Sequence, residues 1–293
     1  MRVGVDGVLV CDKPAGMTSH DVVARIRRLA GQRRIGHGGT LDPPATGVLV
    51  VALGRVTRLL PFLPMEPKRY LATIAFGSET DTLDAAGTVT ATARAEQIDE
   101  EGVAAALTRL TGAQQQVPPM VSAVKLGGER LYAKARRGET VDRAARPITV
   151  HALDLRGFQG GPAPLATVAV TCSGGTYVRV LAADLGRALG SLAHLASLRR
   201  TAVGPFTEQT AHALDELEGA ALEQLLLSPA AAMASGAAAV RALSDQEAAA
   251  LATGQSLDPT GLGEPVAAIA PDGRLVAVIQ DAAGRARPRV VLQ

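Results

Sequence analysis

The stretch from Arg33 to Gly54, which reads RRIGHGGTLDPPATGVLVVALG, constrains the fold more than any other part of the chain. Glycines before Asp42 make the backbone pliable, and the proline after it disfavours a helical conformation at Asp42. The apolar run of residues 47–54 predicts a buried strand or a short packed helix. Asp42 is therefore held on a stiff loop beside the core. It is either a catalytic carboxylate presented by a rigid scaffold or a turn residue that caps backbone N–H groups.

Composition limits the size and the setting of the protein. The chain has 293 residues, enough for one large domain or for a large and a small one. Hydrophobic residues make up 47% and aromatic residues 2%, so we expect a core of mainly Ala, Val and Leu. No apolar run has the length of a membrane span, and the first residues do not resemble a signal peptide. Cys11 and Cys172 lie far apart without metal-ligand spacing, which favours a reducing, cytoplasmic setting.

Charge is distributed unevenly along the chain, although the net charge is only +2. Residues 1–60 contain nine Lys or Arg and four Asp, a net charge of +5. Residues 208–258 contain one Arg and eight acidic residues, a net charge of −7. A biased genome composition can raise the Arg count, but it does not explain this segregation. The basic N-terminal segment predicts a polyanionic partner.

Hydrophobic periodicity predicts a mixture of strands and helices. Thr18 or Ser19 is the expected N-cap of an amphipathic helix, and a second helix begins with acidic residues, as the helix dipole favours. The expected helices cover residues 21–30 and 99–110, and the expected strands cover residues 7–11, 71–76, 88–92, 147–155 and 166–172. Residues 176–185 are expected to pass from strand through turn to helix, and another helical stretch is expected before Arg199.

The composition changes after about Pro229 to an Ala-rich, acidic stretch. Strand candidates follow at residues 265–270 and 275–279, and the chain ends in a basic tail. This segment has the size of a small β-rich appendage near the lower limit for independent folding. We therefore predict two domains, a main domain of residues 1–235 and a small C-terminal domain of residues 236–293.

Three short stretches place polar residues directly before apolar structure: Asp42 in GGTLD, Tyr70 in KRY, and Tyr177 with Arg179 in CSGGTYVR. Arg179 emerges from the apolar run TYVRVLAADL, so we expect it to be partly buried and to need an anionic partner. Asp42 is the strongest candidate for a functional residue. A purely structural ion pair is the alternative explanation.

Several other chemistries find little support in the sequence. The five histidines are scattered, and neither His-x-x-His nor Cys-x-x-Cys occurs, so we predict no metal site. The Gly-x-Ser-x-Gly elbow of serine hydrolases is absent from the sequence. Neither a GxGxxG motif nor a Walker A motif occurs, so no nucleotide cofactor is expected.

Six motifs occur in a fixed order: DKPAGMTS, GHGGTLDPPATGVL, KRY, GSETDTLDAAG, QQQVPPMVSAVKLGGERLYAKARRG and CSGGTYVRVLAADLG. Together they closely resemble bacterial TruB-type tRNA pseudouridine synthases, over roughly residues 7–210. The resemblance implies a mixed α/β (α+β) catalytic domain around an extended, largely antiparallel sheet. It also implies a small PUA-like RNA-binding domain at residues 236–293.

The activity implied by the resemblance is isomerisation of one uridine in tRNA to pseudouridine. The target would be the uridine at tRNA position 55, in the T-arm loop, so tRNA is the expected partner. The reaction breaks the N1–C1′ bond and rejoins the base through C5, and it is neither redox nor hydrolysis. No cofactor, metal, membrane or obligatory protein partner is therefore expected.

The resemblance assigns the central roles to three residues. Asp42 would act at the sugar, either by adding to C1′ or by removing a 2′ proton. Arg179 would pair with Asp42, keep it ionised and fix its aim. Tyr70 would stack on the uracil and assist deprotonation at C5.

Other residues would build the pocket and hold the RNA. Tyr177 would wall the pocket, and Leu198 would close its apolar side. The target base must leave its folded loop by flipping, and His37 would stack in the space that it leaves. Lys13 and Pro14 would support the active loop from beneath.

Two positions depart from the pattern of the family. GHTGTLD reads GHGGTLD here, so Gly38 replaces a hydroxyl that can contact RNA. CSKGTYIR reads CSGGTYVR, so Gly174 replaces a common basic residue. These changes put individual RNA contacts in doubt, but not the chemistry.

A second function belongs to a different class: a non-catalytic tRNA-binding or tRNA-folding factor that uses the same basic surface. Asp42, Tyr70 and Arg179 occurring together favour catalysis. A protein that only binds RNA does not need a buried carboxylate in a site for polyanions.

Overall fold

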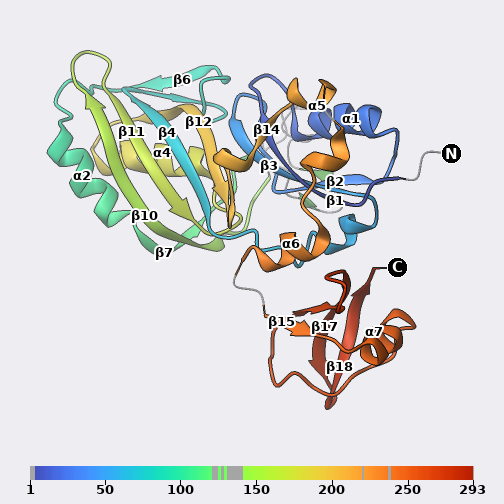
Figure 1. Ribbon diagram of the computed structural model, residues 1–293. Helices are drawn as coiled ribbons and strands as arrows, with labels where there is room; N and C mark the ends of the chain where they lie inside the picture. The colour runs from blue at the N-terminus through green and yellow to red at the C-terminus, as the bar shows by residue number, and fades with distance from the viewer. Residues whose placement is uncertain are drawn as a thin grey trace. The chain divides into compact units, whose positions relative to one another are not determined.

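The structure, a computed structural model, describes residues 4–120, 125–126, 129–130, 141–219, 221–236 and 239–292. The chain forms two compact units, which comprise Met1–Leu41, Gly47–Met65 and Val203–Gln293 in the first and Asp42–Thr46 and Glu66–Ala202 in the second. Helices and strands are interspersed along the chain, and its last part forms a small sheet of its own (Figure 1). The expected mixed α/β (α+β) fold with a small β-rich C-terminal part is confirmed.

The first unit is built on two buried strands. β1 (Gly7–Lys13) runs antiparallel to β3 (Thr46–Leu53), and β2 (Ile35–Gly38) pairs antiparallel with the other edge of β3. A short parallel strand, β14 (His212–Ala213), lies along β1. Nearly every residue of β1 and β3 is buried, because apolar side chains cover both faces of the sheet. The apolar run of residues 47–54 is therefore a strand, not a short helix.

The helix α1 (Ser19–Ala30) covers one face of this sheet. Its N-cap is Thr18, one of the two residues that the sequence offered. The Thr18 hydroxyl accepts a hydrogen bond from the Asp21 N–H, and the Asp21 carboxylate accepts one from the Thr18 N–H. This capping box fixes the first turn of α1. Gly31, with φ of 61°, ends the helix.

The C-terminal sheet, drawn in orange and red in Figure 1, has the strand order β15–β16–β17–β18. Its strands are β15 (Val240–Ala242), β16 (Val266–Ile269), β17 (Leu275–Ala282) and β18 (Arg285–Val291), accompanied by α7 (Asp245–Ala252). The sequence predicted β16 and β17. It missed β15, which lies in the stretch described only as Ala-rich and acidic, and β18, whose arginines were described only as a basic tail. Ala267, Leu275 and Val278 of this sheet belong to one buried cluster with Val8 and Val10 of β1.

The second unit contains a sheet in the order β12–β4–β11–β10–β7. Its strands are β7 (Gly112–Gln116), β10 (Arg146–Gln159), β11 (Leu165–Cys172), β4 (Lys68–Phe76) and β12 (Ala193–Val203). The pairs β4–β11, β11–β10 and β10–β7 are antiparallel. Burial alternates along β4 and β11, because α2 (Glu100–Arg109) and α4 (Val178–Ala188) cover only one face (Figure 1). Of the two helices, α4 carries Arg179.

Two sequence-based expectations for this unit are wrong. Residues 193–203 form the strand β12, not the helical stretch expected before Arg199. The leucines at positions 192, 195 and 198 have helical spacing, but pairing within the sheet overrides this local pattern. Residues 176–185 do not begin as a strand, because α4 starts directly at Val178.

The remaining elements are short. They are β5 (Ser78–Thr80), β6 (Val89–Thr92), β8 (Lys125–Leu126), β9 (Glu129–Arg130), β13 (Phe206–Thr207), α5 (Glu216–Gly219), α6 (Pro229–Ala234), η1 (Gly54–Leu59), η2 (Glu208–Thr210) and η3 (Leu222–Leu225). Most of the motif segment VSAVKLGGERLYAKARRG lies outside the described residues. In the part of the chain that is described, no helix has the length and apolarity needed to cross a membrane.

Candidate active site

The loop between β2 and β3 carries Asp42. Gly39 and Gly47 flank it with φ values of 78° and 102°, which residues with a Cβ rarely adopt. The Ala45 N–H donates to the Asp42 carbonyl over 3.1 Å, so residues 42–45 form a turn. This geometry explains why the sequence places glycines and prolines around one aspartate.

Asp42 pairs with Arg179 at the start of α4. Arg179 Nη2 lies 3.0 Å from Asp42 Oδ2, so the expected ion pair is present. The Arg179 side chain is only 4% exposed, whereas that of Asp42 is 39% exposed. The buried guanidinium thus stabilises the negative charge on a carboxylate that still faces outward. Such a carboxylate is available to a ligand without leaving its partner.

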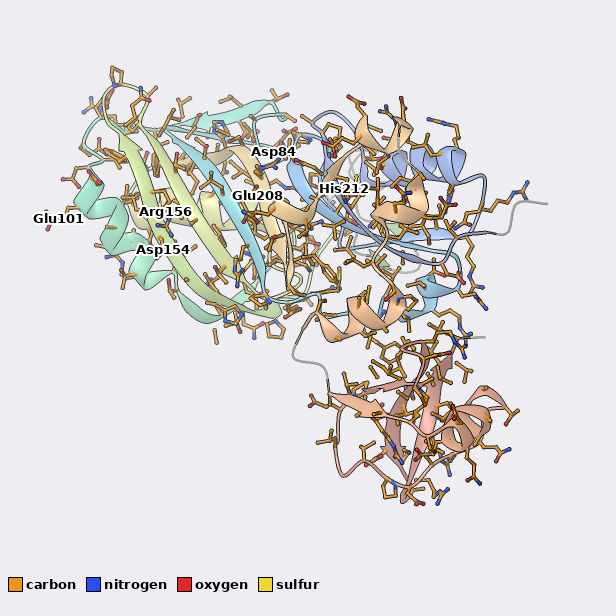
Figure 2. All side chains as sticks on the ribbon, viewed as in Figure 1. Asp84, Glu101, Asp154, Arg156, Glu208 and His212 are labelled. Atoms are coloured by element: carbon orange, nitrogen blue, oxygen red, sulfur yellow. The ribbon has the colours of Figure 1, made fainter. Side chains whose placement is uncertain are left out.

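A second carboxylate, Asp84, approaches the same guanidinium. Asp84, labelled in Figure 2, belongs to the loop between β5 and β6. Its Oδ2 lies 3.6 Å from Arg179 Nη1, and its side chain is 10% exposed. The Thr82 hydroxyl and the Ala86 N–H donate to Asp84 Oδ1 over 2.6 and 3.1 Å. Sequence reasoning saw only an acidic loop here and did not single out Asp84.

The loop reaches Arg179 through an unusual backbone conformation. Leu83 has φ of 61°, a left-handed conformation that is uncommon for a residue other than glycine. On one side of Leu83 the Thr82 carbonyl accepts from Arg179 Nη1 over 2.9 Å, and on the other lies Asp84. Leu195 of β12 holds the turn: its N–H donates to the Leu83 carbonyl over 3.0 Å. A strained residue between two groups that contact one cation marks this loop as part of the site.

Tyr70 lies on β4 beside Arg200 of β12. Both side chains are almost completely buried and share a hydrogen bond. Burial raises the pKa of the Tyr70 hydroxyl, while the positive charge of Arg200 acts in the opposite direction. Burial also lowers the pKa of Arg200 and, together with the Arg200 charge, that of Lys68. Arg200 was noticed in the sequence only as part of an Arg-Arg pair.

A small cavity of about 70 Å³ lies beside the ion pair. Its lining consists of Asp42, Pro44, Ala45, Asp84, Ala85, Arg179, Leu195, Ala196, Ser197 and Leu198. Leu198 therefore does line the pocket, whereas Tyr70 and Tyr177 are not among the lining residues. Typical ligand sites have volumes of roughly 300 to 1,000 Å³. This cavity can enclose only part of a ligand, next to the charged pair.

The other two candidate residues lie in the first unit. His37 is in β2, and its ring meets that of His20 edge to face, with 6.2 Å between the centroids and an interplanar angle of 88°. Lys13 is completely buried at the end of β1. Its Nζ donates to the carbonyls of Pro14 and Met17 over 2.8 and 2.6 Å. Lys13 thus holds the turn that leads from β1 into α1.

A buried serine fixes the residue before Asp42. Ser19 Oγ accepts from the Leu41 N–H over 2.9 Å and donates to the Leu41 carbonyl over 3.2 Å. Both backbone groups of Leu41 are therefore bound to the first residue of α1. The sequence offered Ser19 only as a possible helix cap.

The two glycines that depart from the expected pattern have different surroundings. A Cβ at Gly38 would lie 2.5 Å from Met65 Cε, the end of a flexible side chain. The Gly174 N–H donates to Glu66 Oε1 over 2.9 Å, and a Cβ at Gly174 would meet the same carboxylate. In the described part of the chain, no three His, Cys, Asp or Glu side chains gather as metal ligands would.

Comparison with known proteins places this geometry in a family. Residues 27–178 match the family model described as TruB family pseudouridylate synthase (N terminal domain). Residues 179–230 match tRNA pseudouridylate synthase B C-terminal domain, and residues 239–293 match tRNA Pseudouridine synthase II, C terminal. The chain belongs to the TruB family of pseudouridylate synthases. The resemblance that the six motifs carry is thereby confirmed.

Relatives and solved structures agree with this membership. A protein from Thermobifida fusca (strain YX), named tRNA pseudouridine synthase B, is 49% identical over 98% of each chain. A protein of the same name from Nocardia farcinica (strain IFM 10152) is 48% identical over 98% of this chain and 93% of its own. A chain in the structure of an H/ACA RNP bound to a substrate RNA containing 2′-deoxyuridine is 23% identical, with a TM-score of 0.73 over 98% of this chain and 85% of that chain. At 23% identity, the similarity to this H/ACA RNP chain concerns the fold alone.

Proposed function

We propose that this protein converts the uridine at tRNA position 55, in the T-arm loop, to pseudouridine. Membership of the TruB family and relatives named tRNA pseudouridine synthase B support an isomerase that acts on uridine in tRNA. The observation that carries the proposal is the outward-facing Asp42 carboxylate, held 3.0 Å from a buried guanidinium at the edge of a small cavity. No observation favours the alternative of a non-catalytic tRNA-binding or folding factor.

Asp42 starts the reaction at the sugar. The N1–C1′ bond breaks, the uracil turns, and a C5–C1′ bond forms, after which C5 loses a proton and N1 gains one. The carboxylate either adds to C1′ and is later released, or takes a 2′ proton and later returns it. Both routes need an ionised and correctly aimed carboxylate. Arg179 supplies the aim, and Asp84 and the Thr82 carbonyl hold Arg179.

The detached base is held by the walls around this pair. Tyr70 stacks on the uracil and assists the loss of the C5 proton, and Leu198 closes the apolar side of the pocket. The ordinary pKa of tyrosine, about 10, already lies well above 7, and burial raises the pKa of Tyr70 further, so its hydroxyl is neutral at pH 7. It can therefore accept the C5 proton only while passing its own proton on. Tyr177, the N-cap of α4, walls the part of the uridine site that lies beyond this cavity.

Other parts of the chain hold the tRNA. The basic residues of the N-terminal segment attract the phosphates, and His37 stacks in the space left by the flipped base. Residues 236–293 act as a small PUA-like RNA-binding domain, a division supported by the family model that begins at residue 239. The substrate implies a cytoplasmic enzyme, without a metal or organic cofactor.

Mapping of pseudouridine tests this proposal. Wild-type protein is incubated with unmodified tRNA in the presence of EDTA, and every uridine is then examined for pseudouridine. We expect one product position, in the T-arm loop, and the same product in a T-arm minihelix. Absence of pseudouridine, or its formation at other positions only, would contradict the proposal.

A further inference from the structure

Gln116, the last residue of β7, is bonded twice to the backbone of Tyr177. Gln116 Nε2 donates to the Tyr177 carbonyl over 3.2 Å, and the Tyr177 N–H donates to Gln116 Oε1 over 2.8 Å. The amide is almost completely buried. It exchanges with Tyr177 the same pair of hydrogen bonds that two residues exchange across an antiparallel ladder.

Tyr177 is the residue at which α4 begins. It is the N-cap, and its own side chain makes no capping hydrogen bond. The Tyr177 carbonyl also accepts from the N–H groups of Val180 and Leu181, over 3.1 and 3.2 Å. Gln116 therefore binds both backbone groups of the residue from which the first turn of α4 starts.

The two bonds between Gln116 and the Tyr177 backbone are called the Gln116 clamp. The first turn of α4 carries Arg179, two residues after Tyr177. Arg179 must meet three oxygens at once: Asp42 Oδ2 at 3.0 Å, the Thr82 carbonyl at 2.9 Å and Asp84 Oδ2 at 3.6 Å. A guanidinium is planar and its donors are fixed, so a shift of the helix start moves all three contacts together.

We propose that Gln116 is a positioning residue for the Asp42–Arg179 pair. Its amide fixes the N-terminus of α4 and thereby the place of the Arg179 guanidinium. Gln116 does not touch the reacting atoms, and it acts through Arg179. This inference rests on the proposed isomerase function, because the loss of Gln116 is expected to act mainly on the rate of pseudouridine formation.

The test compares two glutamines of one strand. Gln116→Met keeps the length of the side chain and removes both bonds to Tyr177. Gln114→Met is the matched control, because Gln114 Nε2 donates over 2.8 Å to the carbonyl of Leu110, the C-cap of α2, and not to a residue of α4. We expect Gln116→Met to lower kcat about 10- to 100-fold, since small displacements of catalytic groups have effects of this size. The KM of Gln116→Met for tRNA should stay close to that of the wild type. The control Gln114→Met should turn over tRNA at close to the wild-type rate.

A double-mutant comparison separates positioning from a general structural role. Single-turnover pseudouridine formation is measured for Gln116→Met in the wild-type chain and in Arg179→Lys. If Gln116 acts through the guanidinium fork, most of its effect disappears once the fork is absent. Thermal unfolding identifies the temperature at which every variant is folded, and Gln116→Asn, which is too short to keep both bonds, replaces Gln116→Met if the latter does not fold.

Two results would overturn the inference: wild-type kcat in a folded Gln116→Met or Gln116→Asn, or the same fold-loss in the wild-type and Arg179→Lys chains. A wild-type protein that forms no pseudouridine would instead refute the proposed function. The two failures are therefore distinguishable.

Discussion

Asp42 and Asp84 both approach the buried guanidinium of Arg179. A change at either carboxylate therefore affects the position of the other through Arg179. The ion pair of Arg179 with Asp42 is short, at 3.0 Å, and that with Asp84 is longer, at 3.6 Å. Asp84 also anchors its own loop through Thr82 and Ala86. Asp84 therefore orients the arginine that orients Asp42.

Asp84→Asn keeps the shape of the side chain and removes the second negative charge. We expect kcat to fall about 10- to 100-fold, because Arg179 loses part of its alignment, with little change in the affinity for tRNA. Asp81→Asn, an exposed position in the same loop, is the control and should retain wild-type kcat. Steady-state kinetics with unmodified tRNA provide the measurement, and equal kcat for the two variants would rule out this role of Asp84.

Sequence reasoning reached some of these residues and missed others for physical reasons. Asp42 is the only acid in its loop, and the apolar run around Arg179 predicts that this arginine is buried with an anionic partner. That the partner is Asp42 followed from the family resemblance, not from local sequence. Asp84 shares the acidic segment GSETDTLDAAG with Glu79 and Asp81. In the structure Asp84, which follows the left-handed Leu83, approaches Arg179, whereas Glu79 pairs with Arg187 and Asp81 accepts from the Thr88 N–H. A local sequence does not contain that information.

At the scale of secondary-structure elements, strongly patterned segments were predictable and tertiary contacts decided the rest. β3 is apolar throughout and β11 alternates, so both were recognised as strand candidates. β12 has helical leucine spacing and became a strand only because it has neighbours in a sheet. The two clamps of this site, Ser19 on Leu41 and Gln116 on Tyr177, join segments far apart in the sequence.

The two hydrogen bonds between Ser19 and the Leu41 backbone predict an effect on turnover that can be separated from an effect on stability. Ser19→Ala leaves the Leu41 N–H and carbonyl without their partner, which costs about 1–3 kcal/mol for a buried group and frees the residue before Asp42. Thr18→Ala removes the N-cap of the same helix, which costs about 1 kcal/mol, but leaves the bonds to Leu41. We expect both variants to lose stability and only Ser19→Ala to lose kcat, by about tenfold or more.

Chemical unfolding and kinetics on the same preparations check this prediction. The comparison is made at a temperature where both variants are folded. A Thr18→Ala variant that loses kcat as much as Ser19→Ala would mean that the effect is one of helix stability alone.

At the scale of the whole molecule, part of the positive charge is neutralised internally. Arg25 on α1 forms ion pairs with Asp215 and Glu218, at 2.9 and 2.6 Å. Arg55 pairs with Asp6. The acidic residues after position 208 thus serve partly as partners for the basic N-terminal segment. Attraction of the tRNA is therefore weaker than the charge count of that segment suggests.

Arginines of the C-terminal sheet can test whether an ion-paired arginine contributes less to tRNA binding than other arginines. Arg285 pairs with Asp258 at 2.7 Å, whereas among the described residues no ion pair involves Arg287 or Arg289. Each phosphate contact adds about 0.7 to 0.9 to the magnitude of the salt slope of binding. Arg287→Gln combined with Arg289→Gln should therefore lower the slope by about 1.4 to 1.8, while Arg285→Gln should change it less. Turnover at saturating tRNA should be unchanged.

The test uses substitutions because a deletion would uncover apolar surface. The C-terminal sheet shares a buried cluster with β1 and α6, so removing residues 236–293 would take apolar side chains out of that cluster. Binding of full-length tRNA is measured at several salt concentrations for each variant. An unchanged slope in the double variant would show that β18 does not contact the phosphates.

The central claim is that the Asp42 carboxylate carries out the chemistry on a bound tRNA. Asp42→Asn keeps the shape of the side chain and removes its charge, so the most direct measurement is single-turnover pseudouridine formation by this variant with tRNA at saturation. We expect a loss of at least about 10⁴-fold, the size typical of a group with a covalent or proton-transfer role, while tRNA binds with nearly wild-type affinity. Pseudouridine formation by folded Asp42→Asn at a rate close to that of the wild type would contradict it.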